Sequence, residues 1–178
     1  HYPAAWPLVF GVGATDPNDL RGNNTNSSNW GTWSNANDGS NFYTPAGSES
    51  ELPYSVVAPG TRILVATTYD PLNTPSDTLS SYSGTSAATP FVAGIAAIML
   101  SKNPNIEPNE LAELIKLNTD KVRTDVYNYN NYTNWSGYND QMFYGRVNCL
   151  ESLEEVDQIN NPFLGIGEYV RTLENVYL

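Results

Sequence analysis

The sequence predicts an α/β fold built on a mostly parallel sheet, and two observations lead to this prediction. Three apolar runs of strand length occur at residues 8–14, 54–58 and 62–66. Longer stretches with helical character follow them, beginning with residues 86–100. Because parallel strands need long crossover connections, which are usually helices, this alternation indicates layers of helix on sheet.

The first apolar run is the clearest strand. Residues 8–14 contain no charged side chain, as expected of a strand that is buried on both faces of a parallel sheet. The second and third runs are separated by a Pro-Gly-Thr turn at residues 59–61. We expect surface loops at residues 16–53 and 67–83, since polar residues dominate the first and no sustained apolar period appears in either.

Three helices are expected in the second half of the chain. Residues 86–100 are apolar on almost every side, so this helix should lie at the centre of a domain. Pro108 in a helical first turn, followed by apolar residues three and four apart, predicts an amphipathic surface helix to about Thr119. Apolar residues at helical spacing predict a last helix over residues 147–158.

The composition excludes several classes of partner. With 19 acidic and 8 basic residues the formal net charge is -11, so the chain lacks the clustered positive charge that nucleic-acid binding needs. The apolar stretch 91–100 is too short to span a bilayer, and we expect no membrane span. Cys149 is the only cysteine, and we expect it to be a small buried apolar group. The low content of charged residues, 15%, favours a secreted protein.

Ser86 is the candidate nucleophile. A serine hydroxyl attacks a carbonyl only with a base within hydrogen-bond reach and with amide donors aimed at the developing oxyanion. Gly84 frees the backbone to turn before Ser86, and small Ala87 and Ala88 leave the hydroxyl accessible at the start of a helix. Serine also caps many helices, so this local pattern leaves the nucleophile and the simple helix cap as alternatives.

The wider sequence around Ser86 carries more information. Residues 84–94 read Gly-Thr-Ser-Ala-Ala-Thr-Pro-Phe-Val-Ala-Gly and resemble the nucleophile segment of the subtilase (subtilisin-like) family of serine proteases. Further segments resemble the family in register: the Tyr-Pro-Ala to Val-Gly-Ala-Thr-Asp stretch at 2–16, Trp-Ser-Asn at 33–35, Val-Ala-Pro-Gly at 57–60, and Tyr-Gly-Arg-Val-Asn at 144–148. The resemblance covers roughly residues 2–153.

The resemblance implies a three-layer subtilisin-like fold, of which residues 1–158 form the C-terminal portion. It implies a secreted endopeptidase that forms an acyl-enzyme on Ser86. In the family, the Asp and His of the catalytic triad and an oxyanion Asn precede the serine, in segments that this sequence does not contain. The chain also begins at His1 without a methionine. We therefore expect the N-terminal half of the same domain as a partner, a protein or peptide as the substrate, and no activity from this chain alone.

Further roles near the nucleophile are implied by the same resemblance. The Ser86 amide and the Thr85 hydroxyl would donate to the oxyanion. His1 lacks the Gly-Thr-His context of the family's catalytic base and stands instead at a position that lines the substrate pocket. The implied oxyanion and substrate-binding residues are Thr85, Ser83, Tyr82, His1 and Tyr2. Subtilisins carry a weak cation site, but Ser55 replaces its expected acidic ligand, so we expect no metal or other cofactor here. Structural calcium stays an option for the complete domain.

Two non-enzymatic functions stay open. The first is a catalytically dead subtilase-like module that serves a secreted protein as a structural or binding part, in which Ser86 survives without the triad Asp or His. The second is an adhesion module, suggested by the aromatic-rich polar loops at residues 30–43 and 127–138. The residues encoded upstream of His1 would separate these alternatives from the protease.

Residues 159–178 are expected to be a linker and the start of a C-terminal extension. Pro162 and a Gly-Ile-Gly stretch have linker character, and the residues after them favour a β-strand. Residues 173–178 resemble the opening of the sorting domains of type IX secretion cargo. The alternatives are secretion by the type IX system, which would place the protein outside the cell or on its surface, and a plain C-terminal strand or linker.

Overall fold

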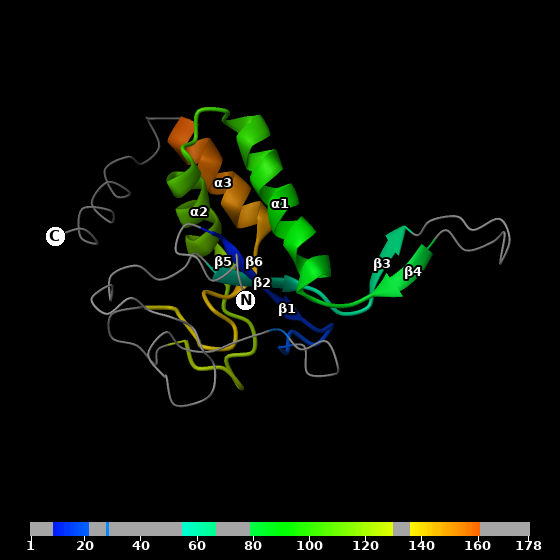
Figure 1. Cartoon of the computed structure of the whole chain (residues 1–178). Coiled ribbons are helices and arrows are strands. Elements are labelled where there is room, and N and C mark those ends of the chain that lie inside the picture. The colour runs from blue at the N-terminus through cyan, green and yellow to red at the C-terminus, as the bar shows by residue number, and fades with distance from the viewer. Residues whose placement is uncertain (1–8, 22–27, 29–54, 67–78, 130–135, 161–178) are drawn as a thin grey trace, which may run out of the picture.

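The computed structural model describes residues 9–21, 28, 55–66, 79–129 and 136–160, and the arrangement of their helices and strands is drawn in Figure 1. The elements, in chain order, are β1 (Gly11–Thr15), β2 (Ser55–Pro59), β3 (Ile63–Ala66), β4 (Leu79–Tyr82), α1 (Thr85–Lys102), α2 (Pro108–Leu117), β5 (Thr119–Asp120), β6 (Arg146–Val147) and α3 (Cys149–Asn160). His1, Tyr2, most of the expected loop 16–53 and the tail beyond residue 160 lie outside the described residues.

The main sheet has the strand order β1-β2-β6-β5 and is mostly parallel. β1 and β2 run parallel from the pair Gly11 and Ser55 to the pair Thr15 and Pro59, and β2 is also parallel to β6. Only the short β5 is antiparallel to its neighbour. The predicted α/β class with a mostly parallel sheet is therefore confirmed. β1, β2 and β3 begin one to three residues later than predicted, and β3 lies outside this sheet.

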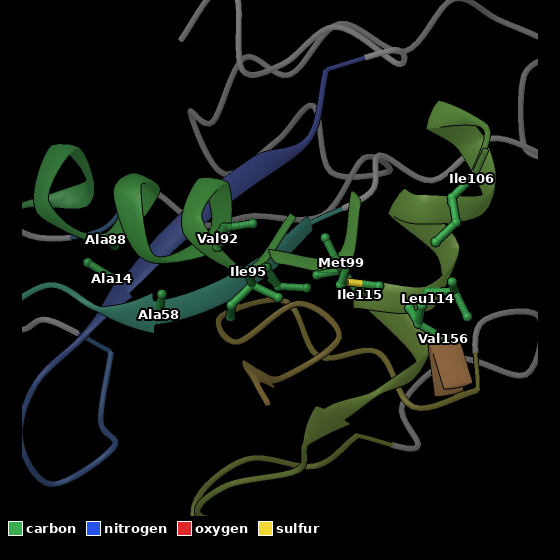
Figure 2. Close-up of a cluster of buried hydrophobic side chains, with 11 residues drawn as sticks. Ala14, Ala58, Ala88, Val92, Ile95, Met99, Ile106, Leu114, Ile115 and Val156 are labelled. Atoms are coloured by element: carbon green, nitrogen blue, oxygen red, sulfur yellow. The ribbon is translucent and has the colours of Figure 1, made fainter. Parts of the chain in front are cut away.

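All three helices pack on one face of this sheet. α1 lies across β1 and β2, and Figure 2 shows side chains from the strands and the helices meeting in one core. α1 contributes Val92, Ile95 and Met99, and α2 contributes Leu114 and Ile115. Full burial of one such side chain contributes about 1.5–3 kcal/mol, so this core holds the helices on the strands. By length and composition alone α1 resembles a membrane span, and its packing on the sheet buries one of its faces.

Turns rather than helices cover the opposite face of the sheet within the described part of the chain. There Val57 packs with Tyr127, Tyr129 and Met142 in a second cluster. The Tyr129 hydroxyl donates to the carbonyl of Val122 at 3.1 Å, while the Tyr127 hydroxyl accepts the backbone N–H of Arg21 at 2.9 Å. The described residues thus supply the helical layer and the sheet of the expected three-layer fold, together with a loop layer.

Several local predictions need correction. The expected loop 67–83 contains strand β4, which pairs antiparallel with β3 in a separate two-stranded sheet. The last helix begins at Cys149 rather than at Val147, because Val147 pairs with Thr119 as part of β6. Cys149 is only partly buried, since it packs against the edge of the helical core. Among the described residues α1 is buried along one face only, so its position at the centre of a complete domain stays a prediction.

Candidate active site

Ser86 is the second residue of α1, and its side chain is exposed. Gly84 is the N-cap of the helix, with a φ of 140°, and no side chain makes a capping hydrogen bond. The interpretation of Ser86 as a simple helix cap is therefore wrong. The small residues that follow explain why the hydroxyl is accessible: Ala87 and Ala88 turn inward to the core and leave Ser86 on the open side.

The start of α1 offers amide donors and no competing charge. The amides of Ala87 and Ala88 both donate to the carbonyl of Gly84, at 3.0 and 3.3 Å. The amide of Ser86 precedes them and has no acceptor within the helix, as is general for the first turn. No acidic side chain occupies this turn, so the positive end of the helix dipole is not neutralised from within it. This arrangement can stabilise an anionic oxygen beside Ser86.

Pro90 changes the hydrogen bonding of the same turn. It has no N–H, so the carbonyl of Ser86 lacks the donor that position 90 would otherwise supply. The Thr89 hydroxyl donates to the carbonyl of Thr85 at 2.9 Å and ties the first turn to the next. Thr85 is half-buried at this point, and the predicted role of its hydroxyl at the oxyanion stays a prediction.

Two glycines bring the turn at Gly84 that leads into Ser86, here called the nucleophile turn, onto the ends of the strands. The amide of Gly84 donates to the carbonyl of Gly60 at 2.7 Å, and the amide of Gly60 donates to the carbonyl of Thr15 at 3.0 Å. A Cβ at position 60 would lie 2.6 Å from the Cβ of Ala14 and 2.8 Å from the carbonyl oxygen of Gly84. Ser86 is thereby held beside the carboxyl ends of β1 and β2, the edge where open parallel sheets bind their ligands.

The segment that leads into the nucleophile turn is the β3–β4 hairpin. The hydroxyl of Ser83 accepts the backbone N–H of Arg62 at 2.9 Å, so Ser83 joins the two ends of the hairpin. Tyr82 pairs with Ile63, and its side chain is exposed. The roles of Tyr82 and Ser83 on the leaving side of a substrate stay predictions. His1 and Tyr2, the other two predicted site residues, fall in the part of the chain that the structure does not describe.

An ionic network, which sequence reasoning missed, fixes the opposite side of the sheet. Arg146 on β6 binds Asp19 at 2.7 Å and Asp120 at 2.8 Å, and Asn148 donates to Asp120 at 2.9 Å. Burial disfavours the ionised form of Asp120, but the hydrogen bonds from Arg146 and Asn148 outweigh it and leave the pKa of Asp120 below its usual value. No local sequence pattern predicts this network, because its members lie far apart in the sequence.

Comparisons with known proteins agree with the fold and with the family that the sequence resembles. The model of the subtilase family matches residues 1–140. Calcium-dependent protease of Trichormus variabilis is 39% identical over 75 residues, which are 42% of this chain and 11% of the relative. Subtilisin DY of Bacillus licheniformis is 34% identical over 110 residues, which are 62% of this chain and 29% of the relative.

A solved structure extends the similarity to three dimensions. The self-cleaved protease domain of PatA aligns with a TM-score of 0.54 at 25% sequence identity, over 88% of this chain and 44% of that one. The chain spans less than a third of the length of the two relatives above and under half of this structure. The family match nevertheless covers well over half of the chain. The chain therefore belongs to the subtilase family, whose related members here are proteases.

Proposed function

We propose that this chain is the nucleophile-bearing half of a secreted subtilisin-like serine endopeptidase. The observation that carries the proposal is the exposed Ser86 at the N-terminus of α1, beside the carboxyl ends of β1 and β2. A hydroxyl at this place lies beside the Ser86 amide, which has no acceptor within the helix and can donate to an oxyanion. Family membership supplies the reaction class, which is hydrolysis of a peptide bond.

In the proposed reaction the Ser86 hydroxyl oxygen attacks the carbonyl carbon of the scissile bond. Its proton passes to a histidine of the N-terminal half, which returns the proton to the leaving amine as the acyl-enzyme ester forms. Water then attacks the ester, releases the acid product and restores the serine hydroxyl. The Ser86 amide and the Thr85 hydroxyl donate to the oxyanion in both steps, together with an Asn of the N-terminal half.

The surface of α1 supports the N-terminal half as the partner. Phe91 and Ile98 are 43% and 48% exposed although they are large and apolar, and Ala93 and Gly94 between them are exposed as well. Phe91, Gly94 and Ile98 line a mostly apolar groove of about 490 Å³ that reaches β6. A second apolar groove, of about 250 Å³, lies between α1, α2 and β1 and includes Ala93. β1 is also the end strand of the sheet, with one edge unpaired by any strand of the described chain. Such apolar surface and such a strand edge are normally covered in a complete domain. Strands and helices of the N-terminal half would cover them here.

Covalent labelling of the complete domain tests the role of Ser86. With the N-terminal half present, a fluorophosphonate probe should label Ser86, and Ser86→Ala should abolish both labelling and peptide hydrolysis. Ser101→Ala is a matched control, because Ser101 is an exposed serine near the other end of the same helix. The 178-residue chain alone should not hydrolyse peptides, since removal of triad members leaves only weak residual catalysis.

Two results would contradict the proposal. Labelling that persists in Ser86→Ala would place the nucleophile elsewhere. A folded complete domain that neither reacts with the probe nor cleaves peptides would favour the catalytically dead structural or binding module.

We also propose secretion, and export by the type IX system as its route. The low charge content and the similarity to subtilisins support secretion. The type IX route rests only on the sequence of residues 173–178, which lie outside the described residues. The encoded gene should then continue after Leu178 into a short domain of alternating strands. A stop codon directly after Leu178 would remove the type IX proposal and leave the protease proposal intact.

A further inference from the structure

The β3–β4 hairpin has one face that is apolar and open. In its antiparallel register Leu64 lies opposite Ser81, and Ala66 lies opposite Leu79, so these four side chains share a face. Leu64 is 71% exposed and Leu79 is 58% exposed, although they are diagonal neighbours that could be buried together. Figure 1 shows the hairpin projecting past the N-terminal end of α1, away from the four-stranded sheet.

The hairpin is joined to the nucleophile turn by hydrogen bonds at its base. Its two ends are linked by the hydrogen bond from Arg62 to Ser83, and directly beyond them Gly84 donates to Gly60. β4 ends at Tyr82, only four residues before Ser86. The open face is therefore connected to the nucleophile through a short, hydrogen-bonded stretch of chain.

We infer that Leu64 and Leu79 form a specificity-determining contact for an apolar side chain of the peptide substrate, several residues from the bond that is cut. The inference rests on the proposed function. Leu79 precedes Ser86 by seven residues, and an extended chain advances about 3.3 Å per residue, so the contact lies within roughly 23 Å of Ser86 along the chain. An extended substrate covers the same distance in about five to seven residues.

An extended peptide is the occupant that fits this surface. The two strands contain no charged side chain, and charge is a common means of protecting exposed strand edges. Each strand pairs only with the other among the described residues, so the outer edges can accept the main chain of a peptide. The apolar face beside those edges then selects an apolar side chain of that peptide. Because this face adjoins the nucleophile turn, we identify the bound peptide as the substrate.

Paired peptides test the inference on the complete protease. Two series of quenched fluorescent peptides of about sixteen residues are needed, one for each side of the scissile bond. In each series, a pair of peptides carries either Leu or Asp at positions five to seven residues from that bond. The wild type should cleave the Leu peptide of one series about tenfold faster in kcat/KM than its Asp partner. Leu64→Ser with Leu79→Ser should remove that preference, while hydrolysis of a four-residue chromogenic substrate stays unchanged and reports correct folding.

Leu117→Ser is the matched control, because Leu117 is 51% exposed on α2, away from the hairpin. Absence of any Leu preference in both series overturns the inference. So does protection of Leu64→Cys from maleimide in the substrate-free protease, which would show that another domain or a second copy covers the face. Failure of the wild type to cleave the four-residue substrate would instead count against the proposed function.

Discussion

The segments that cover the two faces of the main sheet are attached to it in opposite ways. On the helical face, the nucleophile turn approaches the strands because side chains are absent: Gly60 and Gly84 meet through a 2.7 Å backbone hydrogen bond. On the other face, the loop layer is held by side chains that are present, such as Met142 in its core and Arg146 between two carboxylates. The position of the nucleophile should therefore be sensitive to atoms added at these glycines. The stability of the loop layer should be sensitive to the removal of side-chain atoms.

Gly60→Ala should have the largest effect. Its Cβ would lie 2.6 Å from the Cβ of Ala14 and 2.8 Å from the carbonyl oxygen of Gly84, so the backbone must move. We expect a loss of about 3 kcal/mol in the free energy of unfolding of the complete protease. Peptide hydrolysis by the folded enzyme should fall about 100-fold or more, because Ser86 moves with the turn. Denaturant unfolding and hydrolysis rates measure the two effects.

Met142→Ala provides the comparison for Gly60→Ala. Met142 is fully buried in the loop layer, and its truncation should also cost about 3 kcal/mol in the free energy of unfolding. Hydrolysis per folded molecule should hardly change, since this cluster lies across the sheet from the turn. Equal losses of hydrolysis in the two variants would show that the two faces do not act independently.

Arg146→Gln should have an intermediate effect that depends on pH. It leaves Asp19 and Asp120 without their shared cation, and we expect a loss of about 2 kcal/mol at pH 7. Because the pKa of Asp120 is lowered in the folded state, its contribution is fully present above the unfolded value of about 3.9. The contribution is lost as the pH falls through the lower, folded pKa.

The stability difference between wild type and Arg146→Gln should therefore shrink as the pH falls below about 4, which urea unfolding at several pH values can measure. Arg123→Gln is the control, because Arg123 pairs with a more exposed carboxylate, that of Asp125. If the stability difference stayed the same at low pH, the contribution of Arg146 would not depend on the charges of its carboxylate partners.

Gly94→Ala should have the smallest effect, and its sign tests the proposed cover on α1. Apart from its chain neighbours and the nearby backbone of its own helix, no described residue has an atom within 4 Å of a Cβ at position 94. Alanine is also the better helix former by about 0.8–1.0 kcal/mol. If the N-terminal half packs closely on this face, the added methyl should instead destabilise the complete protease by about 1 kcal/mol. Thermal or urea unfolding of the complete domain gives the sign, and a gain in stability would contradict close packing at this face.

Local sequence determined much of the site. The string around Ser86 combines a flexible glycine, small residues that clear the hydroxyl and an apolar helix pattern, and each of these acts within a few residues. For that reason α1 was predictable as Ser86 to Leu100 and is observed as Thr85–Lys102. β1 and β2 were predictable as well, because burial on both faces leaves a continuous apolar run.

Only the tertiary structure decided the rest. β4 has the polar sequence Leu-Ser-Ser-Tyr, and it becomes a strand because the preceding strand, β3, supplies its hydrogen-bond partners. Arg146 meets Asp19 across 127 residues of sequence, a contact that no local pattern encodes. The apolar character of α1 likewise did not reveal that the described residues would cover only one of its faces, since hydrophobic composition fixes how much surface must be buried but not which segment buries it.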